Sequence, residues 1–399
     1  MESLFAVYIN AFFYVLLLFF SWKKNKKYGP AEVLVSLYAI VALLGIFYYN
    51  QNPHSWSLEA SRFFYLFVVF CFFYYPISED RNIEVHSTKM NNSRFYHYVA
   101  WFYIIIAVYS CIVYIPQVIL VLQNPDWGNI YAEAHSKVQT DVFTKIANAF
   151  FHIRYMGIIL FFSFLIEKKS TLFMWLLGVS AFLPVLVVTM LNASRGGVVS
   201  LVFSLYLTYK MFEPSLPSKV GRWLKTIAIM IAPILILYFV QVSVSRFDVG
   251  TTEYESSNSS YIAYLGQSML LFNYGVMDNI SGFSEGGYMF DNEVKLGQIR
   301  GTHFGSGFIT FIGCIYLDFG FWGTLLFALL TFFLLKALFN KRKLGIPELF
   351  ILLTYVMFVF NGVFVSGRGY GHQWVEAFVI YILLKKTETL ITTKKRIIV

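Results

Sequence analysis

Apolar runs of membrane-spanning length recur along nearly the whole chain, separated by short polar segments. A helix that crosses a bilayer needs about 20 mostly apolar residues, and the pattern predicts about eleven such helices, of which the seventh and the last are short. We therefore expect an all-α, polytopic membrane protein in which residues 1–399 form a single membrane domain. The predicted spans are 3–22, 31–49, 58–77, 98–122, 149–166, 171–191, 197–212, 226–244, 321–339, 347–365 and 374–384.

The distribution of Lys and Arg between the predicted loops sets the orientation. Glu2 precedes the first apolar run and a lysine cluster over 23–27 follows it, which predicts a first span rather than a signal peptide. With this cluster in the cytoplasm, 22 of the 31 basic residues fall on the inner side and 9 on the outer side. Because cytoplasmic loops are enriched in Lys and Arg, we expect the N-terminus outside and the C-terminus in the cytoplasm.

The segment 305–339 does not fit a simple alternation of spans. It is too long for one span and short for two with a turn, and Asp318, Phe319 and Gly320 interrupt it. Two full spans would place the basic residues 341–343 outside. We therefore predict an outer half helix over 305–318, re-entrant or lying on the surface, followed by one true span. Non-helical backbone at membrane depth needs protein or water around it, so the half helix is expected to line a cavity.

Two long loops are predicted on the outer side, at 123–148 and 245–304. The second begins with a polar stretch over 251–260, and its middle, 261–276, is apolar enough for an amphipathic helix on the membrane surface. The inner loops are short. We therefore expect any chemistry on the non-cytoplasmic face, and chiefly in the loop 245–304.

Composition supports the membrane assignment, because 58% of the residues are hydrophobic and only 13% are charged, whereas soluble domains are about 25% charged. The net charge of +9 comes from residues assigned to short inner loops, so the expected partner is the lipid bilayer and not nucleic acid. Cys71, Cys111 and Cys314 all lie in apolar stretches, without metal or redox spacing. We expect no metal and no cofactor.

The basic residues of the outer side are unusual, because six of the nine are arginines. Arginine forms bidentate pairs with phosphate and carboxylate and keeps its charge when half buried. Any single one could pair with an outer acid or a lipid headgroup, but the set favours a shared anionic ligand. The nine are Arg62, Lys137, Lys145, Arg154, Arg195, Arg246, Lys295, Arg300 and Arg368.

Three glycine-rich turns carry the candidate site residues. Arg195 lies in the segment 192–197 at the outer junction of two predicted spans, and Gly196 and Gly197 follow it. Glycines let backbone approach a ligand closely, and the N–H groups of a helix start attract anions. We expect Arg195, together with Arg246 of the large loop, to bind an anionic donor group.

The second turn, 297–307, contains Arg300 and His303 and leads into the predicted half helix. His303 is the only histidine of the large loop, and its ordinary pKa near neutrality suits a general base. A histidine bonded to a loop carbonyl is the alternative. We expect Arg300 and His303 to form the catalytic centre; an outer carboxylate, Asp318 or Glu376, is the next candidate for the base.

The third turn, 367–372, contributes Arg368, Tyr370 and His372 as further expected substrate-binding residues. The histidines at 54, 135 and 152 are scattered on the outer side without zinc-ligand spacing. The chain has no P-loop or dinucleotide fingerprint and no soluble domain for a nucleotide sugar. A glycosyl donor, if there is one, should therefore be carried by a lipid.

Taken together, these features resemble those of a known protein family. The many spans, the large outer loop before the last few of them, the segment Ser194-Arg195-Gly196-Gly197 and the segment Tyr316-Leu317-Asp318-Phe319-Gly320-Phe321-Trp322-Gly323 look like the bacterial O-antigen and capsule repeat-unit polymerases of the Wzy type. The overall pattern covers nearly the whole chain, but the local motifs cover only these short segments.

The resemblance implies a metal-independent membrane glycosyltransferase of the GT-C superfamily in the bacterial inner (plasma) membrane. Such an enzyme moves a growing glycan from undecaprenyl pyrophosphate onto a new lipid-linked repeat unit at the outer face. Its partner is the undecaprenyl-pyrophosphate-linked oligosaccharide, and the resemblance leaves room for a chain-length regulator. It does not indicate which sugars are joined.

Three other functions are compatible with parts of the pattern. An O-antigen ligase uses the same chemistry with a lipid A core acceptor. A lipid-linked oligosaccharide flippase or another transporter would have short loops on both sides and ionisable groups within its spans, unlike the large outer loop here. A glycan acyltransferase would display a catalytic His or Arg on an early inner loop, where His86 is the candidate.

Overall fold

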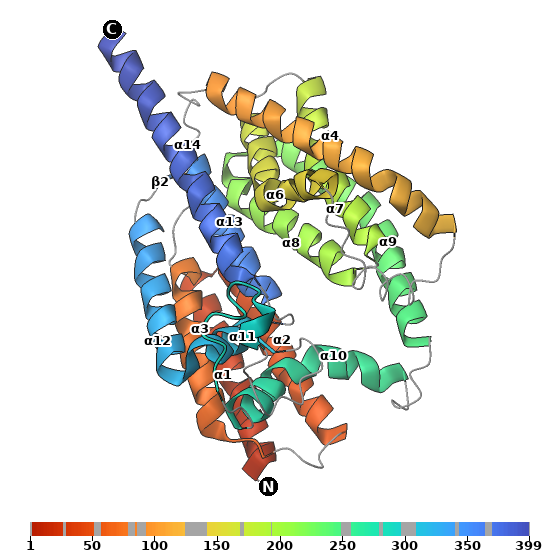
Figure 1. The fold of residues 1–399 in the computed structure, drawn as a ribbon, viewed down its shortest axis with the longest axis vertical. Helices are drawn as coiled ribbons and strands as arrows, with labels where there is room; N and C mark the ends of the chain where they lie inside the picture. Colours follow the sequence, from red (N-terminus) through yellow and green to blue (C-terminus); the bar gives the residue numbers. More distant parts are fainter. Residues whose placement is uncertain are drawn as a thin grey trace. The chain divides into compact units, whose positions relative to one another are not determined.

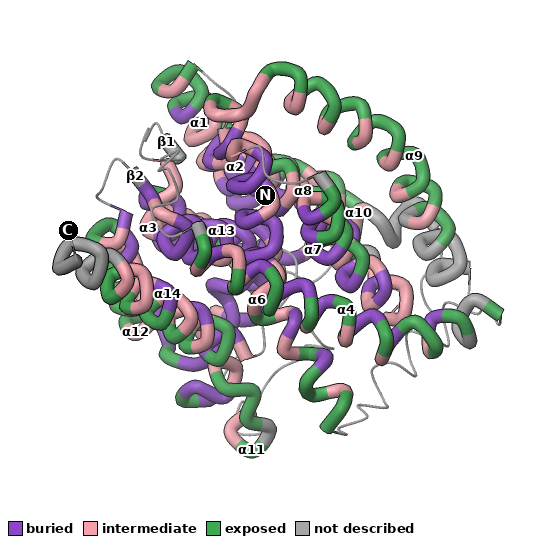
Figure 2. The backbone as a smooth tube through the Cα atoms, turned by 90° about the horizontal axis from the view of Figure 1, so that it is seen from above, coloured by how far each residue is buried: buried purple, intermediate pink, exposed green. Residues whose placement is uncertain are grey.

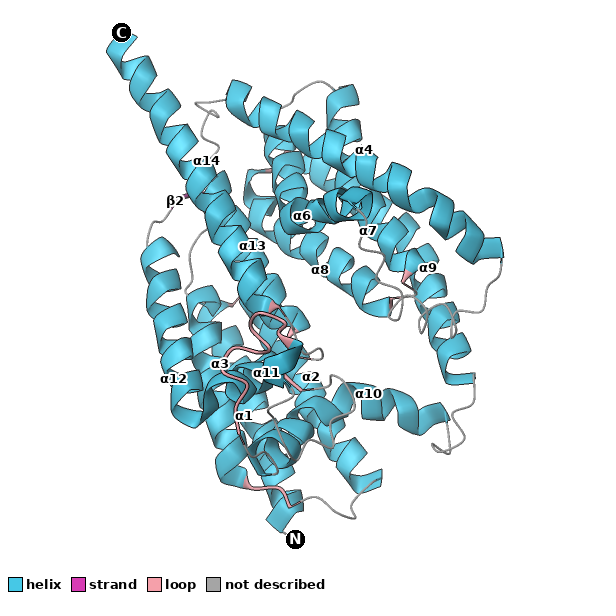
Figure 3. Cartoon of the chain, in the orientation of Figure 1, coloured by secondary structure: helices cyan, strands magenta, loops and turns pink. Residues whose placement is uncertain are grey.

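The computed structural model describes residues 2–26, 29–51, 57–78, 84–85, 93–123, 142–167, 171–192, 194–248, 257–278, 282–296, 309–339, 343–363 and 369–398. Nearly all of these residues are helical (Figures 1 and 3). The two strands that the described part contains, β1 (Glu84–Val85) and β2 (Lys343–Leu344), pair in parallel. The all-α prediction is therefore confirmed.

Each predicted span lies on a helix of its own. The long helices are α1 (Glu2–Asn25), α2 (Pro30–Gln51), α3 (Ala60–Ser78), α4 (Ser93–Gln123), α6 (Val142–Ile166), α7 (Thr171–Leu191), α8 (Arg195–Phe212), α9 (Ser218–Asp248), α12 (Phe311–Phe339), α13 (Ile346–Asn361) and α14 (Tyr370–Ile398). The shorter helical elements are α10 (Ser257–Leu271), α11 (Glu293–Leu296), the 3₁₀ turn η1 (Glu213–Ser215) and the π-helical turn η2 (Phe272–Val276).

Eight of the described helices, α1, α2, α3, α4, α6, α7, α9 and α12, are long and apolar enough to cross a membrane. Their outward faces carry large apolar side chains. Helix α9 is the extreme case, because Ile229 is 72% and Leu237 69% exposed, and Figure 2 draws most of this helix as exposed. Soluble proteins rarely expose apolar patches of this extent, so the chain is consistent with a protein embedded in a membrane.

The chain forms two compact units. Unit 1 comprises Met1–Arg81, Thr252–Lys341 and Tyr355–Val375, and unit 2 comprises Asn82–Thr251, Arg342–Thr354 and Glu376–Val399. Unit 1 contains α1, α2, α3, α10 and α12. Unit 2 contains α4, α6, α7, α8 and α9. Helices α13 and α14 each contribute residues to both units.

In unit 1, the segment predicted as a surface-lying amphipathic helix forms α10 and η2 and packs directly on α2. The two helices meet at Gly45 and Gly266, and a Cβ atom on Gly266 would stand 2.6 Å from the carbonyl oxygen of Leu44. Small residues at the contact between two membrane helices allow their backbones to approach this closely. The large predicted loop is thus partly built into the helical core.

Buried tyrosines join the helices of unit 1 through their hydroxyl groups. Tyr38 donates to the carbonyl oxygen of Val359 at 2.8 Å, Tyr65 donates to that of Phe321 at 2.7 Å, and Tyr355 donates to Phe73. A hydroxyl group that stays unpaired inside an apolar bundle is costly. These bonds therefore tie α2 and α13, α3 and α12, and α13 and α3 together.

Helices α2 and α13 begin with the same capping arrangement. The N–H of Gly29 donates to Glu32 at 2.9 Å, and the N–H of Gly345 donates to Glu348 at 3.1 Å. A glutamate three residues into a helix can bond back to the N–H before it, and its charge suits the positive end of the helix. Lys385 also donates to Glu348, at 2.6 Å. Both glutamates are buried, so the start of each helix is fixed.

Helix α12 is broken at Gly320, which has φ 67° and ψ −168°. The residues before the break, from Phe311 on, are almost all buried, and the first part of α12 lies beside α3 (Figure 1). The break falls on the interruption noted in the sequence. The half helix over 305–318 stays a prediction, because residues 305–308 lie outside the described part and the helix described here begins at Phe311.

The first prediction concerns this break. Gly320→Ala should lower the thermal unfolding midpoint of the purified protein, because an L side chain is strained at this φ and its Cβ would stand 2.7 Å from the Phe283 ring. Strain of this kind costs about 1–3 kcal/mol. Adding Phe283→Ala should restore part of the loss by removing the clash. An unchanged midpoint in Gly320→Ala would show that the break is not needed.

Candidate functional site

The carboxyl group of Asp318, two residues before the break in α12, is the best-defined polar centre of unit 1. The side chain is 1% exposed. One oxygen accepts hydrogen bonds from the Ser284 hydroxyl and the Tyr288 N–H (2.8 Å), and the other accepts from the Met289 N–H (2.8 Å) and the Tyr370 hydroxyl (2.7 Å). We call Ser284, Tyr288, Met289, Asp318 and Tyr370 the Asp318 hub.

The break in α12 makes room for this hub. A helix that ends leaves its last carbonyl groups without intrahelical partners, and the carbonyl of Leu317 accepts instead from the N–H of Ser284 at 2.8 Å. The ring of Phe283 fits against Gly320 because that residue has no side chain. The segment 282–296 is thereby fixed to α12 through both backbone and side chain.

The same loop segment is held from its other edge by the start of α14. The carbonyl of Tyr288 accepts from the N–H of Gly369 at 2.7 Å, and that of Met289 accepts from the N–H of Gly371 at 2.9 Å. A Cβ on Gly371 would stand 2.9 Å from the Met289 carbonyl oxygen. Tyr288 and Met289 thus bond through their N–H groups to Asp318 and through their carbonyl groups to the glycine turn.

The two described candidate site residues of the third turn, Tyr370 and His372, lie in different surroundings. Tyr370 is 1% exposed and donates to Asp318. Burial, followed by the charge of Asp318, raises the pKa of Tyr370, which precedes the predicted span 374–384, so its hydroxyl stays protonated and acts as a donor. His372 is exposed, and its Nε2 lies 3.2 Å from the carbonyl oxygen of Phe290. Both oxygens of Asp318 are occupied, which argues against Asp318 as a base.

The other predicted site residues are described only in part. Arg195 is the first residue of α8 and Arg246 lies near the end of α9, but neither side chain belongs to the described part. Arg300, His303 and Arg368 lie outside the described residues. Their roles as catalytic or substrate-binding residues stay predictions.

The glycines after Arg195 differ from each other. The Ser194 hydroxyl caps α8 by accepting from the N–H of Gly197 at 3.3 Å. A Cβ on Gly197 would stand 2.3 Å from Oγ1 of Thr189, whereas a Cβ on Gly196 would meet only the Ser194 hydroxyl at 3.9 Å. Gly197 is therefore needed for packing between α7 and α8. Only Gly196 leaves open space in which a ligand could approach the backbone.

One of the arginines predicted on the outer side, Arg62, forms ion pairs with acidic side chains. Arg62 pairs with Glu59 at 2.6 Å and with Asp278 at 2.9 Å, and it also donates to the carbonyl of Asn273 in η2. For this residue the geometry agrees with pairing to acids rather than with a shared anionic ligand.

A second polar cluster lies on one turn of α6 in unit 2. Arg154 is the middle residue of this helix, with twelve residues on each side. It donates to the Tyr155 hydroxyl at 2.7 Å and lies 4.7 Å from the centroid of that ring. Its Nε is buried without a hydrogen-bond acceptor. On the same turn, Nδ1 of His152 contacts the carboxylate of Glu376 on α14.

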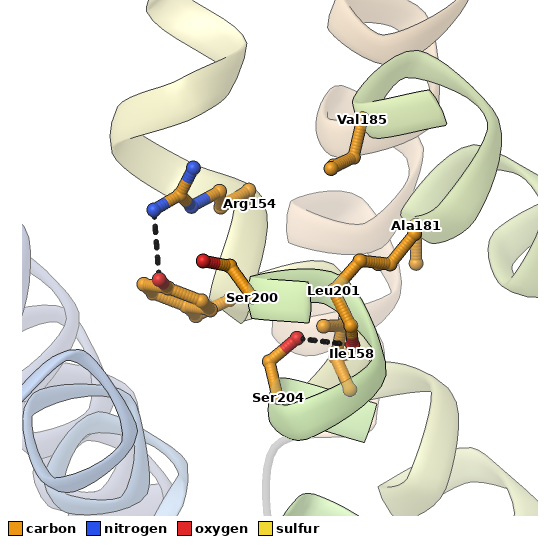
Figure 4. Close-up of a pocket in the computed structure, with 8 residues that line it drawn as sticks. Arg154, Ile158, Ala181, Val185, Ser200, Leu201 and Ser204 are labelled. Atoms are coloured by element: carbon orange, nitrogen blue, oxygen red, sulfur yellow. Dashed lines mark hydrogen bonds between the residues drawn. The ribbon is translucent and has the colours of Figure 1, made fainter. Parts of the chain in front are cut away.

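Arg154 borders a small cavity of about 10 Å³ (Figure 4), room for about one water molecule. Ser200 and Ser204 of α8 face the same space, and Figure 4 draws the Ser200 hydroxyl turned toward Arg154. The remaining lining residues are Tyr155, Ile158, Ala181, Val185 and Leu201. The sequence counted Arg154 only as one of nine outer-side cations; its position inside the apolar run 149–166 was the available signal.

Among the described residues, no three His, Cys, Asp or Glu side chains gather in a way that could hold a metal ion. The Asp318 hub can fix the segment 282–296, and the Arg154 cluster can attract an anion. No family model, curated protein or solved structure matches the chain. The resemblance to the repeat-unit polymerases therefore rests on the sequence motifs alone.

We predict that the Asp318 hub holds the segment 282–296. Asp318→Ala should leave two half-buried N–H groups without acceptors, at a cost of at most about 1–3 kcal/mol each, and should make this segment sensitive to limited proteolysis in the purified protein. Tyr370→Phe removes only one of four donors and should have a smaller effect. Equal protease resistance of Asp318→Ala and the wild type would contradict the assignment.

A matched pair tests the segment 194–197. Gly197→Ala should lower the thermal unfolding midpoint, because its new methyl group meets Thr189, whereas Gly196→Ala should leave the midpoint unchanged. If Gly196→Ala nevertheless lowers ligand binding or activity, the backbone at Gly196 faces the ligand. The packing assignment is wrong if the two variants unfold at the same temperature.

Proposed function

We propose that this chain is a membrane glycosyltransferase that polymerises lipid-linked oligosaccharide repeat units. It would be a GT-C-type protein with about eleven spans in the bacterial inner membrane, its N-terminus outside and its C-terminus in the cytoplasm. It would transfer a glycan from undecaprenyl pyrophosphate to the next lipid-linked unit on the outer face, forming O-antigen, capsular polysaccharide or exopolysaccharide.

The observation that best supports this proposal is the attachment of the outer-loop segment 282–296 to the membrane helices through Asp318. Catalytic groups must be held in a fixed geometry by rigid elements. The segment leads along the chain directly to the predicted catalytic turn of Arg300 and His303. Asp318 and Gly320, which fix it, also belong to the motif that carries the resemblance.

In the proposed reaction, the acceptor hydroxyl attacks the anomeric carbon of the donor glycan and pyrophosphate leaves on its polyprenyl chain. Arg300 and Arg195 would stabilise the charge that develops on the departing pyrophosphate, as fixed cations do in other transition states. His303 would accept the proton of the attacking hydroxyl. The donor chains would lie between the apolar helices.

A lipid-linked oligosaccharide flippase is the second candidate. The division of the chain into two units and the position of Arg154 in the middle of an apolar helix favour it, because transporters move one bundle against another and use charged groups within their spans. An O-antigen ligase would use the proposed chemistry with another acceptor.

Surface glycan from a deletion strain separates these candidates. Loss of a polymerase should leave single repeat units at the surface, whereas loss of a flippase should leave none outside. Loss of a ligase should leave polymer on the polyprenyl carrier. Long polymer attached to its normal acceptor in the deletion strain would contradict all three.

The catalytic assignment is tested with purified protein and purified lipid-linked repeat unit. His303→Ala should lower turnover by about two to four orders of magnitude, as removal of a general base commonly does, while binding of the repeat unit is retained. His97→Gln changes a histidine at the predicted inner end of α4 and should keep its turnover. Near-normal turnover by His303→Ala would remove this histidine from the mechanism.

A further inference from the structure

Arg154 is a charge in the middle of a helix that is long and apolar enough to cross a membrane. Arginine cannot be deprotonated in a protein, so this charge needs an anion, water or a strong dipole near it. In the described part of the chain, no carboxylate forms an ion pair with Arg154. Ionisable residues within membrane-spanning helices mark binding sites or transport paths more often than structural positions.

The side chain is held in place although its charge is not neutralised. The Tyr155 hydroxyl accepts from Nη2 and the Tyr155 ring lies under the guanidinium. Among the remaining N–H groups, that of Nε is buried and has no acceptor. A buried N–H of a charged group without an acceptor is costly, and here the cavity lined by Ser200 and Ser204 lies beside it.

We propose that Arg154 forms a binding site for a phosphate group carried by a lipid. The cavity has room for one oxygen atom, so one phosphate oxygen would take the place of a water molecule and accept from Nε. The guanidinium fork suits phosphate oxygens and its charge offsets theirs. The apolar helices around it suit the hydrocarbon chain. Arg154 is thus distinct from Arg195 and Arg300, which lie at predicted loop junctions.

Two lipids could supply this phosphate group: the polyprenyl pyrophosphate of the donor or acceptor, or a glycerophospholipid headgroup. The polyprenyl source rests on the proposed function, whereas the phosphate site does not. The sources are separated by the probes, which are farnesyl pyrophosphate, inorganic pyrophosphate and phosphatidylglycerol, with farnesol as the phosphate-free reference.

Binding is measured with the full chain in nanodiscs of phosphatidylcholine, without any turnover. Arg154→Gln should weaken farnesyl pyrophosphate binding about tenfold or more, as loss of a charge-assisted hydrogen bond does, while farnesol binding stays unchanged. Arg62→Gln is the matched control: it removes an outer-side arginine that is paired with Glu59 and Asp278, and it should bind like the wild type. Arg154→Lys keeps the charge but has no Nε–H, so it should also bind more weakly.

If phosphatidylglycerol in the nanodisc competes for the site as strongly as farnesyl pyrophosphate does, the site binds a phospholipid headgroup. If it competes only weakly, the site binds a polyprenyl carrier. Wild-type affinity in both Arg154 variants would overturn the site. If Arg154→Gln does not fold, Arg154→Lys alone decides in the same way. If Arg154→Gln loses binding but the wild type does not polymerise repeat units, the phosphate site stands and the proposed function is wrong.

Discussion

A carboxylate buried among apolar helices imposes strict conditions on its surroundings. Asp318 is almost fully buried, and none of the described basic side chains pairs with it. The charge is instead satisfied by two backbone N–H groups and two hydroxyl groups. Such a group is tolerable only when all its donors are in place at once. The break in α12, the path of the segment 282–296 and the start of α14 all follow from this requirement.

The same rule acts on the rest of the bundle in weaker form. The bilayer core holds no water to form hydrogen bonds with polar groups, which favours hydrogen bonds from hydroxyl groups to the backbone of neighbouring helices. Tyr38, Tyr65 and Tyr355 do so in unit 1, and Tyr238 donates to Thr189 in unit 2. Apolar contacts between helices are not directional, and these hydrogen bonds fix how neighbouring helices are placed against one another. Close glycine contacts, as between Gly45 and Gly266, complete the packing.

The length and spacing of apolar runs were enough to predict the helices, because membrane spans depend on local composition alone. The interruption near Gly320 was also visible, since Asp and Gly are rare inside spans. The hub was not predictable from spacing: Ser284 and Tyr370 are 34 and 52 residues from Asp318. Spacing also did not predict that several tyrosines would be fully buried. Arg154 was counted only among the basic residues of the predicted outer side, so its position in the middle of α6 was not recognised.

The order in which the chain is synthesised gives the Asp318 hub one further consequence. Ser284 and the backbone of Tyr288 and Met289 leave the ribosome before Asp318, but Tyr370 follows it by 52 residues. Until the start of α14 has been made, Asp318 lacks a donor, and Tyr288 and Met289 lack the glycine N–H groups that bind their carbonyl oxygens. The segment 282–296 is therefore expected to reach its final position late, after the start of α14 has been made. A chain truncated before α14 would therefore expose the incomplete Asp318 hub to quality-control proteases.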